Sequence, residues 1–168
     1  MTPRFKHALY DYHFVVTFAL LIVAFLLWAF IPSIQTWSFL STSIAAILGL
    51  SYFALKQHLD ETRLFKELFS EFNARYDKLN EALYTISKAP ENQPLTTEEI
   101  MRLYDYFNLC AEEYLYYRKG FIYPEVWQAW HNGMKIFCQF SRIRKLWEKE
   151  LQTNSYYGFS SPCSKQES

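Results

Sequence analysis

Residues 14–31 read FVVTFALLIVAFLLWAFI, an apolar run of 18 residues in which only Thr17 is polar. As an α-helix this run would be about 27 Å long, close to the hydrocarbon thickness of a bilayer. No Asp, Glu, Lys or Arg occurs between Tyr12 and Leu55. The run is too long for a cleaved signal peptide, and a second apolar run follows it at once. It therefore predicts a membrane-spanning helix.

The second apolar run, residues 37–55, is milder and contains a row of small side chains. Ser41, Ala45 and Gly49 are four residues apart and therefore share one face of a helix. Small residues at this spacing let two helix backbones approach closely in lipid. Two interpretations remain open, because this face could pack against the first helix of the same chain or against a second chain.

The charges around the two runs predict the topology. Arg4 and Lys6 precede the first run and Lys56 follows the second, whereas the short connection carries no charge. Positive residues stay on the cytoplasmic side, so both ends of the chain are expected in the cytoplasm. The predicted order is a cytoplasmic N-terminus (1–12), a first span (13–32), an external turn (33–36), a second span (37–55), a cytoplasmic helical domain (56–160) and a flexible tail (161–168).

The composition agrees with a membrane piece joined to a water-soluble piece. The 168 residues include 17 Lys+Arg and 17 Asp+Glu, so no basic excess draws the chain to nucleic acid. The mean hydropathy of -0.14 averages two very different regions. Because the apolar runs carry no charge, a secondary transporter with an intramembrane ion or proton relay is not expected.

The helix predicted after the second run carries apolar residues at alternating spacings of four and three, as in a heptad seam. This candidate assembly seam comprises Phe65, Phe69, Phe72, Tyr76, Leu79, Leu83 and Ile86. The bulky aromatic residues favour a helix that packs on its own domain. A coiled coil between subunits is the alternative.

Further helices are predicted by their end signals. Thr96 with Glu99 forms a capping-box pattern, and Gly120 marks the end of the helix that begins there. Pro124 is expected to begin a third helix of this domain and Ser141 to cap a fourth. No stretch alternates as a strand would. The predicted fold class is all-α, with a transmembrane helical hairpin followed by a small cytoplasmic bundle.

The chemistry-bearing residues give no catalytic or metal-binding pattern. The three cysteines, at positions 110, 138 and 163, have no C-x-x-C spacing and are expected to be free thiols in a reducing compartment. The four histidines form no ligand pair. Asp105, Glu112 and His131 are a weak candidate for catalysis if the fold brings them together. The sequence thus predicts no enzyme, no metal, no cofactor and no small-molecule substrate.

One basic cluster stands near the C-terminus. It comprises Arg142, Arg144, Lys145 and Lys149. On a helix these side chains could contact anionic lipid headgroups or the phosphates of a nucleic acid. The plainer interpretation is a solvated helix face balanced by Glu148 and Glu150.

Four strings in the predicted cytoplasmic domain resemble a family of small bacterial helical proteins. They are EFNARYDKLN (71–80), DYFNLCAEEYLYYRKGFI (105–122), PEVWQAWHNGM (124–134) and SYYGF (155–159). This resemblance covers most of the domain and implies a bacterial origin, and hence the inner membrane, with no established activity.

The layout of two spans and a small helical domain also resembles the two-transmembrane effectors of antiphage systems encoded beside retron reverse transcriptases. That resemblance implies an abortive-infection effector. A reverse transcriptase–DNA/RNA complex would hold it silent and release it when phage attack is sensed. It carries over no functional residue.

Two functions follow as hypotheses. In the first, several hairpins assemble as a homo-oligomer in the lipid bilayer and compromise the membrane, because two helices alone enclose no pore. In the alternative, the hairpin is only an anchor and the helical domain is an adaptor that recruits a soluble partner.

Overall fold

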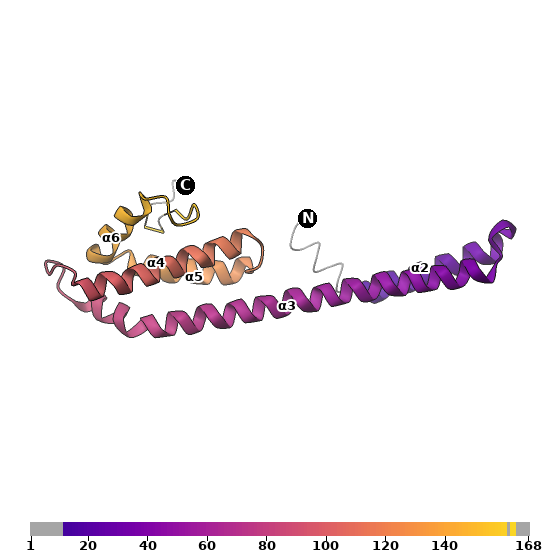
Figure 1. The fold of residues 1–168 in the computed structure, drawn as a ribbon, viewed down its shortest axis with the longest axis horizontal. Helices are drawn as coiled ribbons and strands as arrows, with labels where there is room; N and C mark the ends of the chain where they lie inside the picture. Colours follow the sequence, from indigo (N-terminus) through magenta and orange to yellow (C-terminus); the bar gives the residue numbers. More distant parts are fainter. Residues whose placement is uncertain (1–11, 161, 164–168) are drawn as a thin grey trace. The chain divides into compact units, whose positions relative to one another are not determined.

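The computed structural model describes residues 12–160 and 162–163, and these form five α-helices, one short 3₁₀-helix and no strand. The elements are α2 (His13–Phe30), η1 (Pro32–Ile34), α3 (Trp37–Lys88), α4 (Thr97–Arg118), α5 (Pro124–Phe137) and α6 (Ser141–Leu151) (Figure 1). The predicted all-α fold class is confirmed. The expected cytoplasmic N-terminus, apart from Tyr12, and the expected flexible tail, apart from Pro162 and Cys163, lie outside the described residues.

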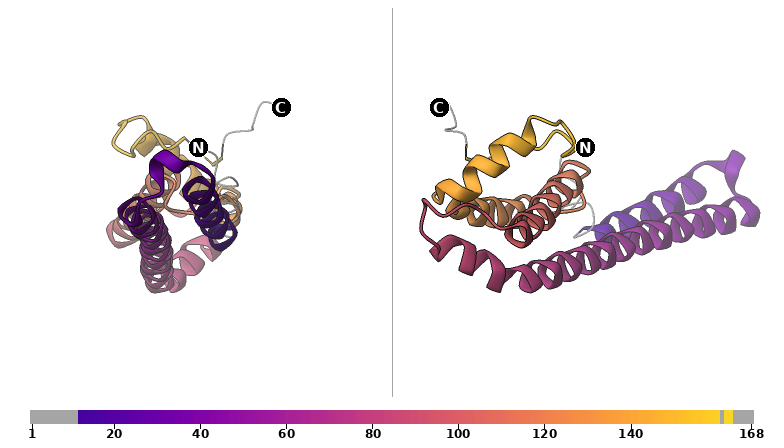
Figure 2. Two further views of the ribbon diagram at one scale, coloured as in Figure 1. Left: turned by 90° about the vertical axis from the view of Figure 1, so that its right-hand side faces the viewer. Right: turned by 60° about the vertical axis from the view of Figure 1, so that its left-hand side comes forward.

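The chain divides into two compact units, with the boundary after Arg63. In the first unit, α2 runs antiparallel to the beginning of α3 (Figure 2). Near the turn, the rings of Trp28 and Trp37 lie 5.4 Å apart. At the far end of α2, Thr17 Oγ1 lies 2.7 Å from Ser51 Oγ. These two contacts define a helical hairpin.

The first helix ends one residue before its apolar run does. Ile31 is extended, with φ -110° and ψ 102°, because the proline that follows disfavours the helical conformation at this residue. The helix therefore ends at Phe30, and its apolar part, Phe14–Phe30, is too short to count as a span on its own. By length and composition, one helix of the described residues could cross a membrane, namely α3.

The apolar side chains of the hairpin are exposed. The apolar window of α3 has a mean hydropathy of 1.6, and none of it is buried within the structure. On α2, Phe14, Phe18 and Phe30 are each more than 65% exposed. Among the described residues of this unit, Ala24 is the one buried hydrophobic residue.

The second unit buries its apolar residues in a single core. Its helices are the C-terminal half of α3 together with α4, α5 and α6 (Figure 1). Trp147 and Phe107 stack at 4.6 Å in the middle of this core, and both are fully buried. The other fully buried large side chains are Phe72, Leu83, Leu103, Tyr106, Leu109, Cys110, Ile122 and Ile143. Four helical segments thus share one core, as expected for a small bundle.

The predicted helix ends agree with the structure at three of four positions. The Thr96 side chain accepts a hydrogen bond from the Glu99 amide, and the Glu99 carboxylate accepts one from the Thr96 amide, so the capping box is present. Gly120 follows α4 with φ +79°, and Pro124 begins α5. The prediction for Ser141 is wrong, since Phe140 holds the N-cap position and no side chain caps this helix.

The cysteine prediction is wrong for two of the three residues. Cys138 and Cys163 form a disulfide with a Cα–Cα distance of 5.2 Å, which ties the chain beyond α6 back to the end of α5. Cys110 is a free buried thiol, as expected. Spacing along the sequence could not reveal the pair, because the two residues are brought together by the turn between α5 and α6 and by the segment after α6.

Candidate functional site

The small-residue face of α3 is open in the structure. Ser41, Ala45 and Gly49 are all exposed. A Cβ atom built on Gly49 would meet no atom within 4 Å. The interpretation in which this face packs against the first helix of the same chain is therefore wrong.

The first helix occupies the opposite side of α3. Ser51 contacts Thr17 of α2, and Ile47, one turn earlier, accepts the hydroxyl proton of Ser51 through its carbonyl at 2.8 Å. At about 100° per residue, Ser51 lies roughly 160° around the helix from Gly49. The first helix therefore lies away from Gly49, and Ser41 and Ala45 of the small-residue face are exposed as well.

The candidate assembly seam lies inside the second unit. Phe72, Leu79, Leu83 and Ile86 are buried in the core, and Phe65 and Tyr76 pack partly against it. Phe69 stacks on Trp130 of α5 at 5.9 Å and stays 39% exposed. A coiled coil between subunits along this seam is therefore wrong, because the residues it would need are already covered by the chain's own helices.

The candidate basic patch is divided by the structure. Arg142 is 7% exposed and points inward. Its Nε donates to the Gln93 carbonyl at 2.9 Å and its Nη1 to the Ile86 carbonyl at 3.1 Å. Its Nη2 lies 3.2 and 3.0 Å from the two carboxylate oxygens of Glu99. This side chain joins α6 to the end of α3 and the start of α4.

The other three cations of the patch lie at the surface. Lys145 and Lys149 are exposed, and Arg144 is half-buried with its Nη1 donating to the Cys138 carbonyl at 3.4 Å. Any contact with an anionic partner on this helix must therefore use these side chains and not Arg142.

The weak catalytic candidate is not assembled. Glu112 forms an ion pair with Arg75, with Nη1–Oε2 and Nη2–Oε1 distances of 2.5 and 3.2 Å. Asp105 lines the same open surface cleft as Glu112. His131 instead stacks on Trp127 with ring centroids 5.5 Å apart, where burial lowers the pKa of its imidazole.

A metal-binding arrangement is not formed by the described residues either. In residues 12–160 and 162–163 no group of three or more His, Cys, Asp or Glu side chains is placed to hold a metal ion.

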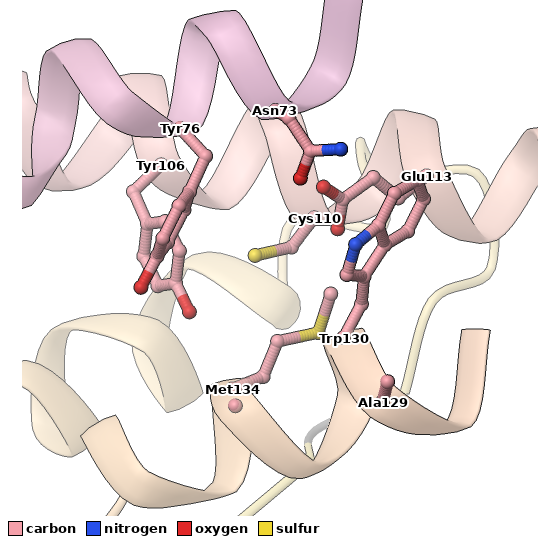
Figure 3. Close-up of a pocket in the computed structure, with 9 residues that line it drawn as sticks. Asn73, Tyr76, Tyr106, Cys110, Glu113, Ala129, Trp130 and Met134 are labelled. Carbon is pink, nitrogen blue, oxygen red and sulfur yellow. The ribbon is translucent and has the colours of Figure 1, made fainter. Parts of the chain in front are cut away.

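Sequence reasoning missed a cavity between α3, α4 and α5. It has a volume of about 160 Å³ and is lined by Asn73, Tyr76, Tyr106, Cys110, Glu113, Ala129, Trp130, Gly133 and Met134 (Figure 3). Glu113 is 6% exposed within it, and burial raises the pKa of this carboxyl to about 8. The signal in the sequence that could have indicated this cavity is Glu113, an acidic residue at a position that continues the apolar face of α4.

Comparisons of the chain with protein-family models, with curated proteins and with solved structures found no match.

Proposed function

We propose that this chain is a membrane effector of a bacterial antiphage system, of the retron-associated, abortive-infection type. Its hairpin inserts into the inner membrane with both ends of the chain in the cytoplasm. Several hairpins then pack together and compromise the membrane barrier. A partner binds the helical domain and controls the effector. The resemblance in layout suggests that this partner is a reverse transcriptase–DNA/RNA complex.

The open small-residue face of α3 carries this proposal. A lone hairpin encloses no pore, so damage requires several copies to associate. Small residues on adjacent turns allow close helix contact in lipid, where van der Waals packing drives association. Because α2 covers the opposite side of α3, Ser41, Ala45 and Gly49 remain available to a second copy.

The exposed apolar surface supports placement of both helices in lipid. Exposure of the large apolar side chains of the hairpin to water is unfavourable in free energy, whereas their contact with the hydrocarbon of a bilayer is not. The apolar part of α2 is short, and a short span is accommodated by local thinning of the bilayer or by oligomerisation. The hydrogen bond between the Thr17 and Ser51 hydroxyls gives both of them a partner inside the pair of helices.

The experiment is induced expression of the full chain in bacteria, with membrane potential and propidium uptake as readouts. We expect depolarisation and dye entry. The double substitution Ala45→Ile with Gly49→Ile should abolish both, because two bulky side chains hold the helix backbones apart. The matched control is Ala46→Ile, which adds the same side chain about 100° around the helix. Oligomers of the chain are captured by chemical cross-linking in the same cells. Unchanged toxicity and unchanged cross-linked oligomers in the double variant would refute the packing face.

A second candidate function is a membrane-tethered adaptor. The observation that favours it is the separate compact unit formed by the second part of the chain, with its own core. The two functions are separated by replacing residues 13–55 with an unrelated two-span hairpin. An adaptor keeps its activity in this chimera, whereas an effector that acts through its own spans loses it.

A further inference from the structure

The cavity between α3, α4 and α5 has the size of a small-molecule site. Its volume of about 160 Å³ is close to the roughly 150 Å³ of an engineered protein cavity that binds benzene. All of its lining residues belong to the second unit, so its shape depends only on the packing of the bundle. Figure 3 shows side chains from three helices converging on it.

Two oxygen acceptors face each other in this cavity. Glu113 is buried, with an exposed fraction of 6%. No other side chain among residues 12–160 and 162–163 forms a hydrogen bond or a salt bridge with its carboxyl. The Asn73 amide nitrogen donates to the Phe69 carbonyl at 2.8 Å. This bond fixes the amide so that its oxygen turns toward Glu113 (Figure 3). When this carboxyl is ionised, neither oxygen of the pair has a donor among the described residues, whereas the neutral acid has an O–H of its own that can donate to the amide oxygen. A ligand that brings N–H donors can take the place of that proton.

The nearest cation does not supply that donor. Arg75 directs Nη1 and Nη2 to the two oxygens of Glu112 at 2.5 and 3.2 Å. It also forms an ion pair with Glu71 on its own helix at 3.9 Å, and its guanidinium lies over the Phe72 ring. Arg75 therefore influences Glu113 only through its charge, and no side chain of the described residues donates to that carboxyl.

The other walls of the cavity are apolar and aromatic. Trp130 is held in place by Phe69 at 5.9 Å and by Phe72 at 5.8 Å. Tyr76 and Tyr106 lie 6.3 Å apart on another side. Aromatic faces attract organic cations when water is excluded, and the body of such a ligand gains from apolar burial.

We propose that this cavity binds a small organic ammonium ion whose N–H groups donate to Glu113 and to the Asn73 amide oxygen. The body of the ligand, of about six to eight non-hydrogen atoms by comparison with benzene, lies against Trp130 and Met134. This site does not depend on the proposed effector function, since it lies in the helical domain and needs no membrane activity.

The number of protons released when a ligand binds is a distinctive readout for this site. Burial raises the pKa of the Glu113 carboxyl to about 8, so the empty cavity holds a neutral acid at pH 7. An ammonium ion favours the carboxylate and lowers that pKa. The groups around Glu113 are Arg75 and Tyr76 on α3 and Tyr106, Cys110 and Glu112 on α4, and the lining residues of α5 do not titrate. Binding at pH 7 should therefore release close to one proton from Glu113.

The test is calorimetric titration of the full chain in a non-ionic maltoside detergent at pH 7. The probe is benzylamine, and benzyl alcohol is its uncharged counterpart. Phosphate and MOPS buffers differ in ionisation enthalpy, so the two titrations together count the released protons. We expect benzylamine to bind at least about tenfold more tightly than benzyl alcohol, because only the amine forms a charge pair with Glu113.

Variants locate the binding. Glu113→Gln should weaken benzylamine binding by about tenfold or more and abolish proton release, and it should leave benzyl alcohol unaffected. Asn73→Leu removes the second acceptor and should weaken the amine selectively. The matched control is Glu148→Gln, which alters an exposed carboxylate outside the cavity. The proposal is overturned if benzylamine does not bind the wild-type chain, if Glu113→Gln binds it equally well, or if benzyl alcohol binds as tightly.

The ammonium group could be free or belong to a lipid headgroup such as ethanolamine, and a competition distinguishes the sources. The titration is repeated in nanodiscs of phosphatidylcholine with and without phosphatidylethanolamine. Suppression of benzylamine binding by phosphatidylethanolamine identifies the headgroup as the source, and unchanged binding identifies a free amine.

Discussion

The two units of the chain place the same kinds of side chain in opposite ways. In the described part of the first unit, large apolar residues such as Phe18 and Leu50 point outward, 67% and 71% exposed. In the second unit, residues of the same kinds, such as Phe107 and Leu83, are completely buried. The bundle therefore draws its stability from its own interior, whereas the hairpin leaves its large apolar side chains uncovered within its own unit.

The difference extends to polar groups. In the first unit, a hydroxyl pair, Thr17 with Ser51, links α2 to α3, while the second unit contains a buried arginine with five hydrogen bonds. A fold that excludes water must satisfy most of its buried polar groups internally. The following three predictions test this contrast, and each uses thermal or denaturant unfolding of the full chain in non-ionic detergent.

The largest effect is expected at Arg142. Arg142→Ala should lower the unfolding free energy of the bundle by about 3–5 kcal/mol, because it leaves Glu99 without its cation and three carbonyls without a donor. Lys149→Ala, on the exposed side of the same helix, should change it by less than about 0.5 kcal/mol. Equal effects of the two substitutions would show that the buried network does not hold the helices together.

A pair of leucines tests the contrast directly. Leu83→Ala should destabilise the bundle by about 2–5 kcal/mol, since it opens a cavity at a fully buried position. Leu50→Ala removes the same atoms from a side chain that is 71% exposed, and it should change the bundle's stability by less than about 0.5 kcal/mol. If Leu50→Ala destabilised the bundle as strongly as Leu83→Ala, the stability of the bundle would depend on side chains of the first unit.

The smallest effect concerns pH. The folded pKa of Glu113, about 8, lies above its ordinary value of 4.5, so the folded state binds the proton more tightly than the unfolded state. Stability from this group is complete below about pH 4.5 and is lost as the pH rises toward 8. We expect a loss of about 2 kcal/mol between pH 6 and pH 8.

The isosteric substitution Glu113→Gln isolates this contribution. The wild-type profile minus the Glu113→Gln profile should fall with rising pH across this range, whereas subtraction of the Glu148→Gln profile should give a flat line. A flat difference for Glu113→Gln would mean that this carboxyl stays ionised in the folded chain.

Sequence reasoning succeeded where structure depends on near neighbours. The capping box of Thr96 and Glu99 spans three residues, and the apolar runs that became α2 and α3 are continuous. Sequence reasoning failed where the partner is distant. Arg142 contacts groups 43 to 56 residues away, so its position in a row of basic residues concealed its burial.

The candidate site could likewise be predicted only where it depends on residues that are close in the sequence. The small-residue face could be recognised from a spacing of four, but its exposure depends on which side of α3 the first helix occupies. The seam could be recognised from its heptad pattern, but only the packing of α4, α5 and α6 shows that its partner is the chain itself. The cavity around Glu113 left almost no pattern, since three helices contribute to it.

The disulfide between Cys138 and Cys163 closes a segment with a sequence separation of 25 that contains α6. Thiols stay reduced in a bacterial cytoplasm and pair in oxidising compartments. If the bundle faces a bacterial cytoplasm, the two cysteines are kept there as thiols, and the disulfide belongs to an oxidising compartment. The degree of alkylation of Cys163 in protein taken directly from cells then shows whether the bundle faced a reducing or an oxidising compartment.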